Sequence, residues 1–135
     1  MRIIFDTNCL LQIFPKSSPY RCLWDAFLSE KFDLCYTTEI LEEYEEVISR
    51  FYSPKVAEFL AGVLLKSINT IQVTPYFQWS LITADYDDNK FVDCAFNAGA
   101  DYLVTNDRHF NVLKSIDFPK IKIIDLEDFK NILGH

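Results

Sequence analysis

Two aspartates stand directly after short apolar segments of the kind that form buried parallel strands. Asp6 follows Ile-Ile-Phe at 3–5, and Asp107 follows Tyr-Leu-Val-Thr-Asn at 102–106. Ligands of open α/β sheets bind outside the carboxyl ends of the strands, so both carboxylates would stand where chemistry takes place. A cap on the helix that follows is the simpler role for Asp6 or Thr7. The recurrence of the pattern at Asp107 favours a shared site.

Two further acids have positions from which they could join this site. Asp88 lies at the start of a helix predicted over 87–98, and Glu43 lies on a helix predicted over 38–51. The apolar stripe of that second helix consists of Ile40, Leu41, Tyr44, Val47, Ile48 and Phe51, and its opposite, solvated face carries Glu39, Glu42 and Glu46. Only Glu43 and Glu45 border the stripe and could reach a partly buried site.

Carboxylates gathered at one place repel one another and raise one another's pKa. A hard divalent cation such as Mg²⁺ or Mn²⁺ removes that penalty and prefers oxygen ligands. Hydrolysis of a phosphodiester is the usual use of such a centre, because the cation activates water and stabilises charge on the phosphate. The candidate catalytic and metal-binding residues are therefore Asp6, Glu43, Asp88 and Asp107.

The chain has 135 residues, half of them hydrophobic, and a net charge of −7. This size and composition predict one globular domain over 1–135. The acidic charge argues against a general nucleic-acid coat protein but is compatible with a nuclease whose cations face the phosphate. No apolar run is long enough for a membrane span, and no signal peptide is evident. The four scattered cysteines form no zinc motif and indicate reduced thiols in a cytoplasmic protein.

Hydrophobic periodicity predicts strands that alternate with helices. The expected strands span 2–5, 32–36, 68–73, 101–105 and 121–124, and the expected helical segments span 8–14, 19–29, 38–51, 54–67, 87–98, 110–113 and 125–132. This alternation predicts a parallel sheet with helices on both faces. The segment 75–87 is irregular and aromatic. Core packing is the expected role of most of its aromatic side chains, and base stacking is the alternative.

Four pieces of the chain, in order, resemble the PIN-domain family, in particular its bacterial and archaeal group of toxins from toxin–antitoxin pairs. They are I-I-F-D-T-N at 3–8, T-T-E-I-L-E-E-Y-E-E-V-I-S-R at 37–50, D-D-N-K-F-V-D-C-A at 87–95 and A-D-Y-L-V-T-N-D-R-H-F at 100–110. The resemblance covers nearly the whole chain. It implies an α/β/α sandwich around a five-stranded parallel sheet of order 3-2-1-4-5. It also implies Mg²⁺- or Mn²⁺-dependent endoribonuclease activity on single-stranded RNA.

The resemblance extends to individual residues. The family's acidic positions match Asp6, Glu43, Asp88 and Asp107. Its supporting polar groups match Thr7, Asn8 and Thr105. Asp93 occupies a position that is often acidic in this group, so it is either an auxiliary metal ligand or an exposed helix residue. The resemblance further implies an antitoxin protein as partner and self-association into a dimer or a larger oligomer.

The sequence leaves the roles of several residues near the predicted site open. A rotated helix would bring Glu42 or Glu45 to the site instead of Glu43. Asp87 is expected to cap the helix that follows it, and His109 is expected to be structural or exposed and not a general base. The cations nearest to the site pieces are candidate phosphate contacts, with a solvated surface position as the alternative for each: Lys16, Arg21, Lys90 and Arg108.

Other classes of protein compete with a nuclease. A non-catalytic RNA-binding or scaffold domain of the same fold would be favoured by loss of one acidic ligand, but all four positions are filled. A haloacid-dehalogenase-like phosphatase needs a second Asp two residues after the first, where Asn8 stands. A receiver domain needs a Lys at the end of its last strand, where Ile124 and Asp125 stand. A metal-dependent ribonuclease is therefore the leading hypothesis.

Overall fold

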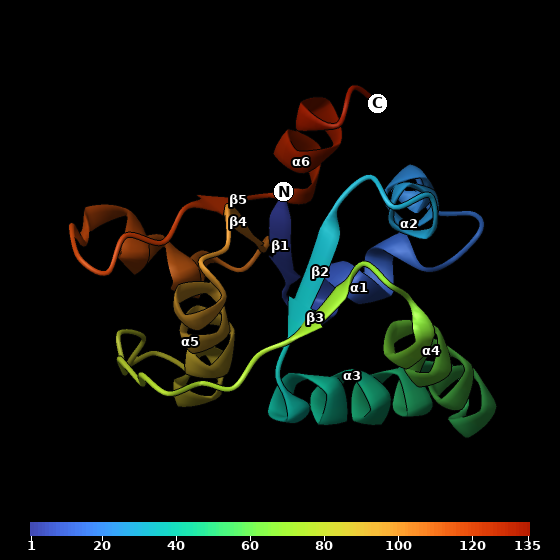
Figure 1. The fold of residues 1–135 in the computed structure, drawn as a ribbon, viewed down its shortest axis with the longest axis horizontal. Helices are drawn as coiled ribbons and strands as arrows, with labels where there is room; N and C mark the ends of the chain where they lie inside the picture. The colour runs from blue at the N-terminus through green and yellow to red at the C-terminus, as the bar shows by residue number, and fades with distance from the viewer.

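The computed structural model describes residues 1–135, and the chain alternates between strands and helices (Figure 1). The strands are β1 (Arg2–Phe5), β2 (Asp33–Tyr36), β3 (Thr70–Gln72), β4 (Tyr102–Val104) and β5 (Ile123–Ile124). The α-helices are α1 (Thr7–Ile13), α2 (Arg21–Leu28), α3 (Thr38–Phe51), α4 (Pro54–Lys66), α5 (Asn89–Ala98) and α6 (Leu126–Ile132). Two 3-10 helices complete the secondary structure, η1 (Tyr86–Asp88) and η2 (Arg108–Ser115).

The five strands form one parallel sheet in the order β3-β2-β1-β4-β5, which confirms the predicted topology. β1 is the central strand, and its Ile3 pairs with Leu34 of β2 on one side and with Tyr102 of β4 on the other. A central parallel strand is covered by helices on both faces, and Ile3, Ile4 and Phe5 are accordingly fully buried. This burial explains the uninterrupted apolar run that precedes Asp6.

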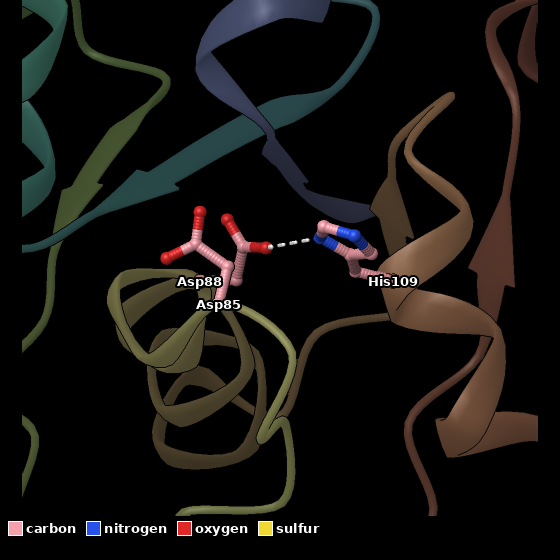
Figure 2. Close-up of side chains that lie close together, drawn as sticks. All are labelled: Asp85, Asp88 and His109. Carbon is pink, nitrogen blue, oxygen red and sulfur yellow. Dashed lines mark ion pairs between the residues drawn. The ribbon is translucent and has the colours of Figure 1, made fainter.

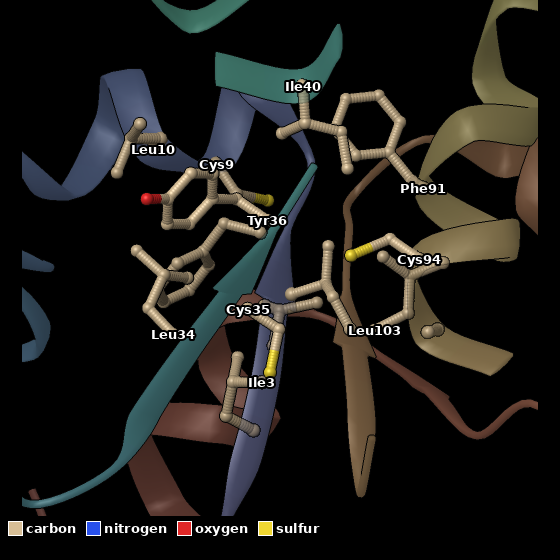
Figure 3. Packing of buried hydrophobic residues seen from close by; sticks show 14 of the residues in the cluster. Ile3, Cys9, Leu10, Leu34, Cys35, Tyr36, Ile40, Phe91, Cys94 and Leu103 are labelled. Carbon is tan, nitrogen blue, oxygen red and sulfur yellow. The ribbon is translucent and has the colours of Figure 1, made fainter. Parts of the chain in front are cut away.

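Helices on the two sides of the sheet hold β1 in place. α5 packs against β1, β2 and β4, whereas α1 packs against β1 and joins α2 and α3. Figure 3 shows Cys9 and Leu10 of α1 and Phe91 and Cys94 of α5 meeting the side chains of the strands. These side chains belong to one hydrophobic cluster of 33 buried residues. The core therefore fixes the strand that presents Asp6. None of the helices is long and apolar enough to cross a membrane.

The predicted helix boundaries are confirmed where capping residues mark them. The Thr37 hydroxyl accepts from the Ile40 backbone N–H at 3.2 Å at the start of α3. The Ser53 hydroxyl accepts from the Val56 backbone N–H at 3.1 Å at the start of α4. Gly99 ends α5 with a φ of +61°, a left-handed conformation that glycine adopts without steric cost.

The aromatic segment 75–87 departs from its expected role in the core. Three of its aromatic side chains are largely exposed: Tyr76 (83%), Phe77 (60%) and Tyr86 (70%). Trp79 is half-buried and packs edge-on against Phe96 of α5, with ring centroids 5.0 Å apart. The expectation of core packing was therefore wrong for the three exposed rings. The segment lies outside the sheet after β3, and the rings of Phe77 and Trp79 pack against Phe96 of α5.

Candidate active site

The carboxyl ends of β1 and β4 bring Asp6 and Thr105 side by side. Phe5 pairs with Val104 at the end of the two strands, and the Asp6 backbone N–H donates to the Val104 carbonyl oxygen at 3.0 Å. The Thr105 hydroxyl then donates to Asp6 Oδ2 at 2.9 Å. Both side chains are buried, so the fold holds the Asp6 carboxylate in one orientation.

Asp107 lies two residues beyond Thr105, and the Thr105 hydroxyl links it to Asp6. The Asp107 backbone N–H donates to this hydroxyl at 3.0 Å, while the hydroxyl donates to Asp6. Asp107 Oδ1 accepts from the His109 backbone N–H at 2.9 Å and so caps η2. One threonine therefore positions both strand-end acids.

The surroundings of Asp6 disfavour its charged form. Burial raises the pKa of Asp6, and the charges of Asp107 and Glu43 raise it further, whereas the hydrogen bond from Thr105 lowers it. The acids that act on Asp6 are themselves predicted site residues, so they lie close enough to repel it. An ionised Asp6 is therefore costly here unless a cation is near.

Asp88 carries a buried oxygen that accepts no hydrogen bond from the protein. Its side chain is 13% exposed, and its Oδ2 atom is buried and accepts no hydrogen bond. Burial raises the pKa of Asp88 to about 6, the charges of Asp85, Asp107 and Asp6 add to the shift, and His109 opposes it. Folded proteins pair nearly all of their buried polar atoms. This oxygen is therefore the point at which an added cation would find a ligand.

Asp85 and His109 complete this cluster, and the sequence analysis gave neither a part in it. One ligand atom each from Asp85, Asp88 and His109 lies within 4.8 Å of the others (Figure 2). His109 Nδ1 is 3.7 Å from Asp88 Oδ2 and 3.6 Å from Asp107 Oδ1. We call the residues Asp6, Asp85, Asp88, Asp107 and His109 the Asp88 cluster. Asp6 and Asp107 are not in the 4.8 Å set.

Asp85 also takes the capping role that the sequence analysis assigned to Asp87. Asp85 Oδ1 accepts from the Asp87 backbone N–H at 3.1 Å at the start of η1. The Asp87 side chain is 78% exposed and caps no helix, so that expectation was wrong. The 3-10 turn η1 precedes α5 and moves the cap two residues upstream. The sequence offered one signal for this arrangement, namely three aspartates within residues 85–88. The segment is irregular, however, and no periodicity predicts the direction of each side chain.

Glu43 alone among the glutamates of α3 is turned toward the site. Its Oε2 accepts a hydrogen bond from the Thr7 hydroxyl, and its Oε1 lies 2.8 Å from Lys90 Nζ. Glu42 and Glu45 are exposed and line a groove between α3 and α4. The helix is therefore oriented as its apolar stripe indicates, with Tyr44 buried and Glu43 at the edge of the buried face.

Asp93 is buried, and its carboxylate holds the aromatic segment 75–87. Asp93 Oδ1 accepts from the Trp79 backbone N–H at 2.9 Å, which ties the aromatic segment to α5. Burial raises the pKa of Asp93, the Trp79 hydrogen bond lowers it, and the charge of Glu39 raises it. It is thus not an exposed helix residue, and its role as an auxiliary metal ligand stays a prediction.

The four candidate phosphate-binding cations occupy different surroundings. Lys90 is buried against Glu43. Arg21 donates to the Phe14 carbonyl oxygen and pairs with Asp25, and Lys16 lies near it in an apolar groove. Arg108 is exposed and lines a depression of about 410 Å³ that also includes Asp107. Arg108 is therefore the cation most accessible beside the site. The supporting residue Asn8 is exposed on α1.

The family model of the PIN domain matches residues 2–109 of the chain. The chain belongs to the PIN-domain family. The matched range contains all four predicted acids, both threonines that hold them and the two residues that the sequence analysis missed. The sequence has no significant match among curated proteins.

Two solved structures share the PIN fold of this chain. One is a VapBC2 complex from Rickettsia felis bound to a DNA fragment from its promoter, with 15% identity and a TM-score of 0.65. The other is DNA-bound VapBC from Salmonella typhimurium, with 18% identity and a TM-score of 0.56. Each match covers 93% of this chain and 98% of the other chain. At these identities the likeness concerns the fold.

The residues of this PIN domain fit a divalent cation. Carboxylate oxygens are the ligands that Mg²⁺ and Mn²⁺ prefer, and Asp6, Asp88 and Asp107 supply them from three elements. The unpartnered Asp88 Oδ2 is the specific observation that favours this fit. Burial is the main reason that the pKa of both Asp6 and Asp88 is raised, and repulsion by neighbouring acids adds to it. A cation there would offset both effects.

Proposed function

We propose that this PIN-domain protein is a divalent-metal-dependent endoribonuclease that hydrolyses phosphodiester bonds of single-stranded RNA. The observation that carries the proposal is the buried, unpartnered Asp88 Oδ2 between other acids at the carboxyl edge of the sheet. Mg²⁺ or Mn²⁺, when bound there, supplies charge stabilisation on the phosphate and activation of water. Asp6, Asp88 and Asp107 are the proposed ligands, and Glu43 is the fourth acid of the site.

The protein's own groups prepare this site in two ways. Thr105 orients Asp6 directly and Asp107 through its backbone N–H, so two ligands are fixed before any cation arrives. Burial of Asp6 and Asp88 keeps bulk water from screening their charges. Exposed Arg108, beside Asp107 in the 410 Å³ depression, is the proposed contact for a flanking phosphate of the RNA.

We further propose that the protein is the toxin of a toxin–antitoxin pair that acts in the cytoplasm. The PIN domain and the fold shared with two VapBC complexes support this role. The partner would be an antitoxin protein that blocks the nuclease. The four cysteines are free thiols, which is compatible with a reducing compartment. Self-association of the chain is part of the same proposal.

The test is cleavage of a panel of structured and unstructured RNAs by the purified chain. Mn²⁺ or Mg²⁺ should support cleavage of the unstructured RNAs, and EDTA should abolish it. Asp6→Asn should lower the rate at least about 100-fold, because it removes a charged ligand from the site. Asp117→Asn is the matched control, since Asp117 is an exposed acid. Equal rates for wild type and Asp6→Asn would refute the catalytic assignment and favour a non-catalytic RNA-binding or scaffold domain.

A further inference from the structure

Lys90 is a buried cation beside a site made mostly of acids. Its side chain is only 8% exposed, and its Nζ lies 2.8 Å from Glu43 Oε1. Nζ also donates to the Asp87 carbonyl oxygen at 3.0 Å and lies 3.7 Å from the Asp87 carboxylate. Lysine is almost never this buried unless it is paired. The ammonium group is therefore held in place from two sides and is not a mobile surface charge.

Both oxygens of Glu43 are engaged by groups of the protein. Oε1 faces the Lys90 ammonium, and Oε2 accepts from the Thr7 hydroxyl. Asp88 lies two residues before Lys90, and its Oδ2 has no partner. Glu43 therefore faces a buried ammonium and a hydroxyl donor, whereas Asp88 Oδ2 accepts no hydrogen bond and has the half-exposed His109 imidazole 3.7 Å away.

We propose that the Lys90 ammonium is the resident counter-ion of Glu43, so that Glu43 is not a metal ligand and the centre binds a single divalent cation, at the Asp88 cluster. A second divalent cation beside Glu43 would have to displace a buried ammonium or lie next to it, and both are electrostatically unfavourable. The inference rests on the proposed function only in taking a divalent metal as the cofactor. It makes Lys90 a positioning residue, which acts through Glu43.

The test is the stoichiometry and affinity of Mn²⁺ binding to the full chain, measured by calorimetry and by electron paramagnetic resonance without RNA. Wild type should bind one Mn²⁺ per chain. Lys90→Met frees Glu43 and should add a second, weaker Mn²⁺. Lys90→Arg retains the charge and should keep one. Lys114→Met, at an exposed lysine on η2, is the matched control and should also keep one.

A double variant separates ligand loss from a folding defect. Glu43→Gln alone leaves a buried ammonium without its partner, so Glu43→Gln/Lys90→Met removes both charges together. This variant should bind one Mn²⁺ with an affinity within about threefold of wild type, whereas Asp88→Asn should weaken binding at least about tenfold. Circular dichroism confirms that each variant is folded.

Three results would overturn the inference. They are two Mn²⁺ ions per wild-type chain, one ion per chain in Lys90→Met, and loss of binding in the double variant comparable to that in Asp88→Asn. The cleavage assay keeps this inference apart from the proposed function. A chain that binds one Mn²⁺ but leaves RNA intact would refute the function alone. A chain that cuts RNA with two Mn²⁺ ions would refute the inference alone.

Discussion

The Glu43–Lys90 pair and the Asp88 cluster are adjacent, and both depend on carboxylates, but they differ in what surrounds each oxygen. Glu43 has a cation on one oxygen and a hydroxyl donor on the other. Asp88 is more deeply buried, with 13% of its side chain exposed against 26% for Glu43. Asp88 nevertheless has no hydrogen-bond donor on Oδ2, and its near neighbours include three other acids.

The difference shows that one site can contain a carboxylate that the protein stabilises, Glu43, and a carboxylate that is available to a ligand, Asp88. Burial of a charge that has its partners in place costs little free energy of folding, whereas burial of a charge without partners destabilises the fold. The Glu43 side is complete as the chain folds. The Asp88 side stays energetically unfavourable until something outside the chain neutralises it, and proteins place such strained groups at functional sites.

The largest expected effect separates two neighbouring acids of η1. Asp88→Asn should lower RNA cleavage at least about 100-fold, because Asp88 is a proposed ligand. Asp87→Asn should change cleavage less than about threefold, since its side chain is 78% exposed. Steady-state cleavage rates with Mn²⁺ measure both. Similar losses of cleavage in the two variants would contradict a specific role of Asp88 as a metal ligand.

The pH dependence of stability tests the same cluster without RNA. The pKa of Asp88 is about 6 in the folded chain, against an ordinary value of 3.8. Between these values the folded state holds more protons than the unfolded state, so the free energy of unfolding should fall as pH rises from about 4 to about 7. The contribution of Asp88 is at most about 3 kcal/mol. Chemical denaturation in EDTA across this range measures it.

Asp88→Asn is the control for that measurement. An amide has no charge to bury, so the variant should lose less stability on raising the pH and should be at least as stable as wild type at neutral pH. Added Mn²⁺ at one fixed concentration should stabilise wild type at neutral pH more than the variant, because a ligand that binds only the folded state shifts the unfolding equilibrium according to its affinity. A pH profile identical in both proteins would contradict the assigned role of Asp88.

Thr105→Val tests the link between the two strand-end acids. The change leaves Asp6 Oδ2 without its donor and the Asp107 backbone N–H without its acceptor, so we expect a loss of about 1–3 kcal/mol in the free energy of unfolding. Thr105→Ser should restore most of it. Thr83→Val at an exposed position should stay within about 0.5 kcal/mol of wild type. Wild-type stability of Thr105→Val would show that the threonine does not organise the acids.

The smallest expected effects distinguish cations near the site from cations elsewhere. In an Asp6→Asn background, Arg108→Met should weaken RNA binding a few-fold and reduce the slope of log affinity against log salt by about 0.7. Arg21→Met should change neither, because Arg21 is engaged by Phe14 and Asp25. Fluorescence anisotropy at several salt concentrations measures both. Equal effects of the two changes would contradict the proposed contact between Arg108 and a phosphate of the RNA.

Local patterns were sufficient to predict the sheet and the order of its elements. The apolar run at 3–5 predicted a strand buried on both faces, and Ile3, Ile4 and Phe5 are buried there. Helical periodicity over 38–51 placed Glu43 and Glu45 at the two borders of the apolar stripe, and the structure turns Glu43 toward the site and leaves Glu45 exposed. These predictions succeed because a residue's position within a regular element depends on spacing along the chain.

The spacing of residues along the chain could not predict the side-chain positions in the irregular segments. Asp85 and His109 lie in or next to short 3-10 turns, where no period relates sequence distance to direction. The exposed aromatic side chains of 75–87 failed as core predictions for the same reason. Their surroundings depend on the path of a loop between β3 and α5.

The sequence by itself predicted a parallel sheet between helices with acids at its carboxyl edge, because strand ends and helix faces follow from local hydrophobic periods. The strand order followed from the resemblance of four motifs to the PIN-domain family. Only the tertiary structure decided which basic side chains face those acids. Lys90 meets Glu43 across 47 positions of sequence, and His109 meets Asp88 across 21. Such partners are chosen by the packing of α3, α5 and η2 against one sheet, and no local pattern encodes that packing.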